Sequence, residues 1–131
     1  ASGDVRGTSA VLWSVDRDTP YVSSPLLHDG LIYVLKGNSG VLTSFDARTG
    51  ARRYGPHRQS GICNVYTSPV AAGGRLYVTS RDGTTIVLRA GPTFEVLAIN
   101  TLDDGFDASP AIVDGEIYLR GQRYLYCIAE E

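Results

Sequence analysis

The chain has little of what stabilises small secreted domains or anchors proteins in membranes. Its 131 residues include two cysteines, one tryptophan and no methionine. Two cysteines are too few for a disulfide framework, and the longest apolar run, 124–129, has six residues. A membrane-spanning helix needs roughly 20 apolar residues. The composition therefore excludes a disulfide-stapled domain and predicts no membrane span.

An excess of charge of one sign is absent as well. The 14 acidic and 12 basic residues are interspersed, and the net charge is −2. Nucleic-acid-binding domains usually carry a basic block or stripe, so the sequence predicts no nucleic-acid partner. The first residues show no signal-peptide pattern and no methionine. We therefore expect a processed or excised piece, whose compartment its N-terminus does not reveal.

Glycine and tyrosine are abundant, and they follow a pattern that occurs three times. Each unit opens on Ser-Pro, has a glycine five residues after the proline and, three residues later, a tyrosine between aliphatic residues. The units start 44 and then 41 residues apart. Periods of about 40–45 residues built from short strands are typical of β-propeller blades. The repeated residues are Pro25, Gly30 and Tyr33, then Pro69, Gly74 and Tyr77, then Pro110, Gly115 and Tyr118.

Each unit has apolar segments of strand length separated by turn residues. The prolines are expected at the starts of innermost strands, where a missing N–H matters least. No helix longer than about one turn is expected. The expected strands are 24–28, 31–35, 41–45 and one starting at 51–54 in the first unit, 68–72, 75–79, 84–89 and 94–102 in the second, and 109–113, 116–119 and 124–128 in the third.

The third unit lacks a fourth strand, and a candidate for it lies at the other end of the chain. Residues 11–15 precede the first Ser-Pro by about the distance at which 96–99 precede the third. The predicted fold is therefore all-β, with three four-stranded β-propeller blades, one of them split between the N- and C-termini. The units span about 22–60, 66–104 and 107–131, the last completed by 10–16. Trp13, an aromatic residue in an alternating strand, is expected to be largely buried between blades.

Three blades alone do not make a closed propeller, since known rings have about four to eight blades. An open arc would leave apolar blade faces exposed. Two solutions remain open. The chain is part of a longer propeller, or it is a homo-oligomer in which two copies join head to tail and lend residues 11–15 to each other's third blade.

Two segments carry a family resemblance. The turn 45–50, which follows 41–44, resembles the quinoprotein-type repeat with its alanine-x-aspartate-x-x-threonine-glycine-x-x-x-tryptophan pattern, and 11–14 resembles the tryptophan-bearing end of such a repeat. Ser44 and Tyr54 replace the alanine and the tryptophan, and the second unit lacks the Asp-x-x-Thr-Gly turn. The chain is thus identified as a pyrroloquinoline-quinone-like β-propeller repeat protein, a type that includes the propeller lipoprotein of the outer-membrane barrel-assembly machinery. The resemblance implies an extracytoplasmic location, periplasmic or secreted.

The cysteines separate this chain from the quinone-dependent dehydrogenases that share the repeat. The resemblance implies that those enzymes carry adjacent cysteines and a calcium site beside the cofactor, whereas Cys63 and Cys127 are far apart. We therefore expect no cofactor, no metal and no catalytic residues. Cys127, in an apolar run, is expected to be a small buried hydrophobic residue. Cys63, with no partner base in a recognisable motif, is expected to have a structural role.

Candidate binding residues lie in the connections that gather on one propeller face. The longest connection, 55–64, is polar, and long loops on rigid scaffolds often carry function. In 103–107 three carboxylates fall within five residues, but their spacing matches no calcium loop, so a turn is favoured. The candidate ligand-binding residues are His57, Arg58, Asn64, Tyr66, Arg81, Asp82 and Arg120.

Two functions follow as hypotheses. The first is a non-catalytic binding scaffold for a protein or peptide, because no nucleophile–base pair, metal motif or phosphate loop is recognisable. The second is a fragment of a quinone- or sugar-dependent oxidoreductase whose cofactor-binding blades lie outside this chain.

Overall fold

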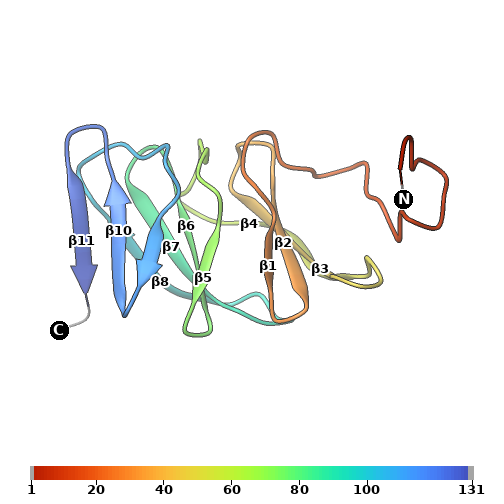
Figure 1. The fold of residues 1–131 in the computed structure, drawn as a ribbon. Helices are drawn as coiled ribbons and strands as arrows, with labels where there is room; N and C mark the ends of the chain where they lie inside the picture. The colour runs from red at the N-terminus through yellow and green to blue at the C-terminus, as the bar shows by residue number, and fades with distance from the viewer. Residues whose placement is uncertain (1, 130–131) are drawn as a thin grey trace.

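A computed structural model describes residues 2–129 of the chain, and its described residues form eleven β-strands and no helix. The strands make three antiparallel sheets that stand side by side in a row (Figure 1). We call them blade 1 (β1–β4), blade 2 (β5–β8) and blade 3 (β9–β11). The strands are β1 (Leu26–His28), β2 (Leu31–Lys36), β3 (Val41–Asp46), β4 (Arg52–Arg58), β5 (Val70–Ala72), β6 (Arg75–Thr79), β7 (Thr84–Arg89), β8 (Val96–Thr101), β9 (Ala111–Val113), β10 (Glu116–Arg120) and β11 (Leu125–Ala129).

The repeat pattern has one structural meaning in all three blades. The first strand of each blade begins directly after the repeated proline, as expected. The repeated tyrosine lies in the second strand opposite that first strand residue, which pairs Tyr33 with Leu26, and likewise Tyr77 with Val70 and Tyr118 with Ala111. The turn between these strands in blade 1, Asp29-Gly30, has positive φ at both residues, as a tight hairpin turn requires. The predicted all-β propeller architecture is confirmed.

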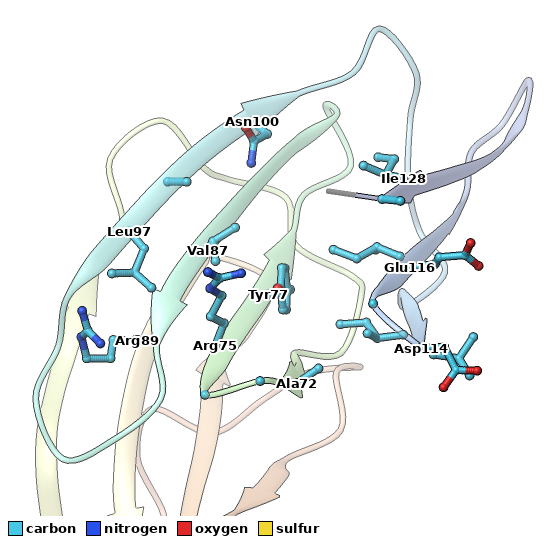
Figure 2. A pocket seen from close by; sticks show the side chains of 18 residues that line it. Ala72, Arg75, Tyr77, Val87, Arg89, Leu97, Asn100, Asp114, Glu116 and Ile128 are labelled. Carbon is cyan, nitrogen blue, oxygen red and sulfur yellow. The ribbon is translucent and has the colours of Figure 1, made fainter. Parts of the chain in front are cut away.

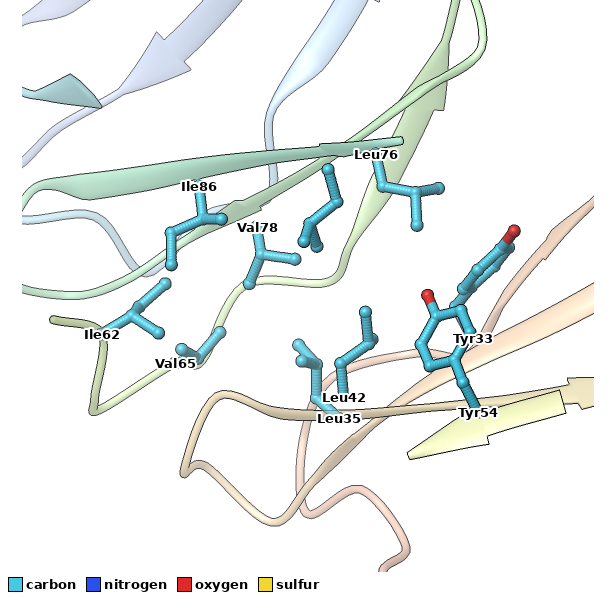
Figure 3. Close-up of a cluster of buried hydrophobic side chains, with 10 residues drawn as sticks. Tyr33, Leu35, Leu42, Tyr54, Ile62, Val65, Leu76, Val78 and Ile86 are labelled. Carbon is cyan, nitrogen blue, oxygen red and sulfur yellow. The ribbon is translucent and has the colours of Figure 1, made fainter. Parts of the chain in front are cut away.

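The main core lies between blades 1 and 2 (Figure 3). Tyr33, Leu35 and Leu42 from blade 1 face Leu76 and Leu88 from blade 2, and all five side chains are at most 1% exposed. Burying each such side chain contributes about 1.5–3 kcal/mol. The Tyr33 phenol stays hydrogen-bonded in this core, because the Gly91 N–H donates to its oxygen at 2.8 Å. Blade-on-blade packing is thus the main source of stability.

A second contact between neighbouring blades involves an aromatic residue on the outermost strand of one blade. It packs on the turn that precedes the outermost strand of the next blade. Tyr54, on β4 of blade 1, packs edge-on against Phe94, which lies in the β7–β8 connection of blade 2, at 5.8 Å between ring centroids. Trp13 lies in the same way over the β3–β4 turn of blade 1. A Cβ added at Gly50 would come 2.7 Å from the indole ring, so this close approach requires glycine.

Three expectations are wrong, and in each case the reason is that no further blade lies beside blade 1 or blade 3 among residues 2–129. Residues 11–15 form no strand, because β11, their expected pairing partner, lies at the opposite end of the row (Figure 1). Trp13 is half-buried rather than largely buried, since only blade 1 covers it. Cys127 is exposed, not buried, because the face of blade 3 that carries it meets no further blade among residues 2–129. Cys63 is a free, exposed thiol as well.

Candidate functional site

The connections between the second and third strands, and those between successive blades, lie at one end of the three sheets, at the top of Figure 1. We call this surface the loop face. It comprises residues 37–40, 59–69, 80–83, 102–110 and 121–124.

Backbone hydrogen bonds link the loop face from blade to blade. The Val65 N–H donates to the Asn38 carbonyl at 2.9 Å, and the Arg81 N–H donates to the Asn64 carbonyl at 3.0 Å. The Gln122 N–H donates to the Gly105 carbonyl at 2.9 Å in the same manner. Each connection between blades therefore lies against the loop of the blade before or after it, and the face is held as one surface.

Side chains form a second row of contacts across the same face. The Asn38 amide donates to the Tyr66 hydroxyl at 2.9 Å. The Arg81 guanidinium lies 3.8 Å from the centroid of the Tyr66 ring, within the range of a cation–π contact. Arg81 Nε also donates to the Asp107 carboxylate at 2.6 Å, which raises the pKa of the guanidinium. These residues link the loops of blades 1 and 2 with the connections that lead into blades 2 and 3.

Asp104 anchors the end of the loop face at blade 3. Its side chain is 1% exposed, and it accepts N–H bonds from Gly105, Arg123 and Tyr124 at 2.8–3.2 Å and an O–H bond from Tyr126 at 3.2 Å. Burial by itself would raise the pKa of this carboxyl, but the donors outweigh burial and the pKa lies below its ordinary value. Asp104 is therefore an ionised acceptor that holds the loop 121–124 in place.

The structure brings three of the seven predicted site residues together, namely Asn64, Tyr66 and Arg81. Asp82 is their neighbour, and its carboxylate accepts the Ser80 hydroxyl. A hollow of about 640 Å³ next to them is lined by Arg81, Asp82, Asp103, Gln122 and Arg123, among others.

The other predicted residues lie farther from this centre. Arg58 and Arg120 are exposed end residues of β4 and β10. His57 belongs to β4 rather than to a loop, and its ring stacks on Phe94 at 4.5 Å between centroids. Strand β4 thus includes the first four residues of the expected connection 55–64.

Three residues of this face were missed in the sequence, namely Asn38, Asp104 and Asp107. Each is a common turn residue, and only the packing of separate loops gives it a partner. The acidic stretch 103–107 contains two of them, but its carboxylates diverge: Asp103 is exposed, Asp104 is buried and Asp107 pairs with Arg81. Among residues 2–129 no group of three or more His, Cys, Asp or Glu side chains is placed to hold a metal ion.

A second concavity separates blades 2 and 3 away from the loop face (Figure 2). It is a cleft of about 1260 Å³. Tyr77, Val87 and Ala98 line it from blade 2, and Ile112 and Ile128 line it from blade 3. Its walls correspond, one blade further along the chain, to the two faces that pack tightly between blades 1 and 2.

Comparison with known proteins shows the family to which the chain belongs. A family model described as "Outer membrane protein assembly factor BamB" matches residues 6–128. The chain belongs to this family. The BamB family is built of the pyrroloquinoline-quinone-like repeats expected from the sequence. A search of curated proteins found no significant match.

Solved structures similar to this BamB-family chain share its fold. BamB from Moraxella catarrhalis matches 89% of the chain with 20% identity and a TM-score of 0.70. The quinohemoprotein alcohol dehydrogenase ADHIIG from Pseudomonas putida HK5 matches 82% with 21% identity and a TM-score of 0.62. The corresponding enzyme from Comamonas testosteroni matches 78% with 21% identity and a TM-score of 0.61. The matched regions cover 36%, 18% and 17% of those proteins, so the chain spans about a third of BamB and less than a fifth of either dehydrogenase.

No helix among the described residues is long and apolar enough to cross a membrane.

Proposed function

We propose that this chain is part of a β-propeller scaffold that binds a protein or peptide through its loop face, without catalysing a reaction. The observation that carries the proposal is the Tyr66–Arg81–Asp107 row. Arg81 and Asp107 keep 45% and 47% of their side-chain surface exposed while they hold each other in place. Tyrosine and arginine dominate binding energy at protein interfaces, and side chains that are already ordered lose little entropy when a partner binds.

The chemistry of the face supports a scaffold over a catalytic site. The most buried carboxyl on it, Asp104, has a lowered pKa, whereas a general acid or base needs a pKa near the working pH. Its oxygens already accept several N–H bonds. The ionised Asp104 carboxylate therefore holds a loop in place, and it carries no proton that it could transfer to a substrate.

The predicted site residues take different places in this proposal. Asn64, Tyr66 and Arg81 form the centre of the binding surface, and Asp82 borders the hollow beside it. Arg58 and Arg120, at the ends of strands that lead into the loop face, supply positive charge at its rim. His57, stacked on Phe94, serves the packing of blade 1 on blade 2.

A fragment of a quinone- or sugar-dependent oxidoreductase is the second candidate, because dehydrogenase propellers share this fold over 82% and 78% of the chain. We propose an extracytoplasmic location with either function, because the location is inferred from the family and does not depend on which function is correct. The homo-oligomer expected from the split blade is a proposal as well.

Selection of peptides against the purified chain tests the scaffold. A selected peptide should bind the Arg81→Ala variant at least about tenfold more weakly, a loss of about 1.4 kcal/mol. Arg89→Ala is the matched control, because Arg89 forms a similar exposed ion pair with Glu95 but lies at the opposite end of blade 2. Equal binding to both variants would exclude the loop face as the binding surface. Quinone-dependent turnover that is lost in Arg81→Ala but kept in Arg89→Ala would favour the oxidoreductase.

A further inference from the structure

The outermost strands of blades 1 and 2 differ in how their free edges are built. Strand β4 carries three exposed arginines, Arg52, Arg53 and Arg58, and the exposed Pro56. Charged side chains and proline keep an open sheet edge from pairing with other chains. Strand β8 has no charged residue and no proline, and all six of its residues are exposed. Blade 1 therefore has a protected edge and blade 2 an unprotected one.

The backbone of β8 directs hydrogen-bonding groups toward this unprotected edge. Within the part of the chain that the structure describes, β8 pairs with β7 and with no other strand. The Leu102 N–H, directly after β8, donates to the Gly83 carbonyl at 3.1 Å and so points to the β7 side. Successive residues of an antiparallel strand direct their backbone groups to opposite edges. The N–H and C=O groups of Ile99 and Thr101 therefore point away from β7.

Apolar side chains accompany the open edge. Ile99 lies opposite Ile86, and Val96 lies opposite Leu88. Because Ile86 and Leu88 belong to the core between blades 1 and 2, and facing residues share one side of a sheet, Ile99 and Val96 lie on the side of blade 2 that faces blade 1. They are nevertheless 54% and 42% exposed. Both blades have four strands, so this exposure arises between two complete blades.

Charged residues flank the open edge only at its two ends. Glu95, directly before β8, pairs with Arg89 at 2.5 Å. Asp103, shortly after β8, pairs with Arg123 at 3.2 Å. The six residues of β8 leave an uncharged edge about 20 Å long. A charged side chain of a partner would meet no opposite charge on β8, so the edge suits an uncharged segment.

The open edge also leads into the loop face. Thr101, the last residue of β8, and Leu102 line the hollow of about 640 Å³ beside Arg81. A segment that lies along β8 therefore reaches this hollow at one end. The ligand that matches a row of alternating N–H and C=O groups is another extended backbone.

We infer that an extended, uncharged segment of a partner protein adds to blade 2 as a strand along β8. Its apolar residues lie against Val96 and Ile99, its backbone pairs with Ile99 and Thr101, and its end enters the hollow of the loop face. The inference rests on the proposed function, since it describes how the partner lies on the same scaffold.

A strand-forming peptide tests the inference on the unmodified chain. The probe is a peptide of alternating valine and threonine, as long as β8 and flanked by lysines for solubility. Its fully N-methylated form has the same side chains but no N–H groups, and should bind at least about tenfold more weakly. The probe should slow amide hydrogen exchange at Ile99 and Thr101, because their N–H groups become hydrogen-bonded. The Leu102 amide, already bonded to Gly83, is the internal reference.

Two substitutions at one position separate the backbone from the side chain. Ile99→Pro removes the outward N–H and leaves the pairing with β7, since proline is accepted at such edge positions. Ile99→Ala removes the side chain but keeps the N–H. Ile99→Pro should bind the probe at least about tenfold more weakly than Ile99→Ala. Circular dichroism checks that both variants fold, and the exchange measurement needs neither of them.

Four results would overturn strand addition. They are no binding of the probe, equal binding of its N-methylated form, unchanged exchange at Ile99 and Thr101 when the probe is bound, and equal binding by folded Ile99→Pro and Ile99→Ala. Probe binding that is lost in Arg81→Ala but kept in Ile99→Pro also overturns it, while the loop face remains the binding surface. Failure of Arg81→Ala to weaken selected peptides contradicts the proposed function instead.

Discussion

The indole of Trp13 donates its N–H to the backbone carbonyl of Ala47, 34 residues away in sequence, at 3.0 Å. The same ring lies over Gly50 and 6.1 Å from the ring of Phe45, measured between centroids. This side chain therefore helps to hold the N-terminal segment, residues 5–16, on blade 1, next to the Asp18–Lys36 ion pair. It is also the only tryptophan, so its fluorescence reports this contact directly.

Replacing Trp13 should loosen the N-terminal segment from blade 1. We expect Trp13→Ala to lower the free energy of unfolding by about 2 kcal/mol, less than for a fully buried tryptophan because the ring is half-buried. Trp13→Phe keeps the ring contact but loses the indole hydrogen bond, at a cost of about 1 kcal/mol. Urea unfolding followed by circular dichroism, at one protein concentration, measures both. Equal losses in the two variants would mean that the ring contact contributes nothing.

The repeated tyrosines should respond differently to the same substitution. Tyr33→Phe removes the acceptor of the Gly91 N–H in a buried core, so we expect a loss of about 1–2 kcal/mol. Tyr118 occupies the equivalent position, but its hydroxyl bonds the neighbouring Glu116 side chain and interacts with Cys127 on the facing strand, on the uncovered face of blade 3. Tyr118→Phe should leave the urea midpoint unchanged. A similar loss in both variants would show that blade 3 is covered in solution.

Gly83 should be intolerant of a side chain. It has φ +96°, and an added Cβ would lie 2.1 Å from the Leu102 carbonyl oxygen and 2.7 Å from that of Asp104. We expect Gly83→Ala to cost more than about 2 kcal/mol, because the backbone of the loop face must shift. Gly73, with φ +56° and open space around it, is the control, where alanine should cost about 1 kcal/mol. Thermal unfolding compares the two variants. Equal melting temperatures would show that the loop face yields to the added methyl group.

Acid should weaken the loop face through Asp104. The pKa of its carboxyl is lower in the folded chain than its ordinary value of 3.8, so its stabilising effect is present above about pH 4 and is lost as the pH falls through the folded pKa. Asp104→Asn should therefore lower the urea midpoint at pH 7 and reduce the difference between pH 7 and pH 3.

Asp103→Asn is the matched control for this pH dependence, since the Asp103 side chain is fully exposed beside the same loop. It should retain both the stability of the unmodified chain at pH 7 and its loss on acidification. The explanation fails if Asp104→Asn unfolds at the same urea concentrations as the unmodified chain at both pH values.

Much of the fold could be predicted from the sequence because it depends on local patterns. Apolar segments between turn residues located the eleven strands of residues 2–129 to within a few residues, although the expected strand at 11–15 does not form, and the prolines marked where first strands begin. The candidate site was predictable only in part. Asn64, Tyr66 and Arg81 lie on loops whose positions the repeat implies, whereas Asp104 and Asp107 could not be distinguished from ordinary turn carboxylates.

By itself the sequence determined the repeat and the order of the strands, because these depend on the alternation of apolar segments and turn residues along the chain. Only the tertiary structure decided what each repeated residue experiences. Tyr33 is buried and Tyr118 half-buried at equivalent positions, because blade 2 covers the first and no blade among the described residues covers the second. The contact of Arg81 with Tyr66 was decided in the same way, since it joins loops whose separation depends on how the blades pack.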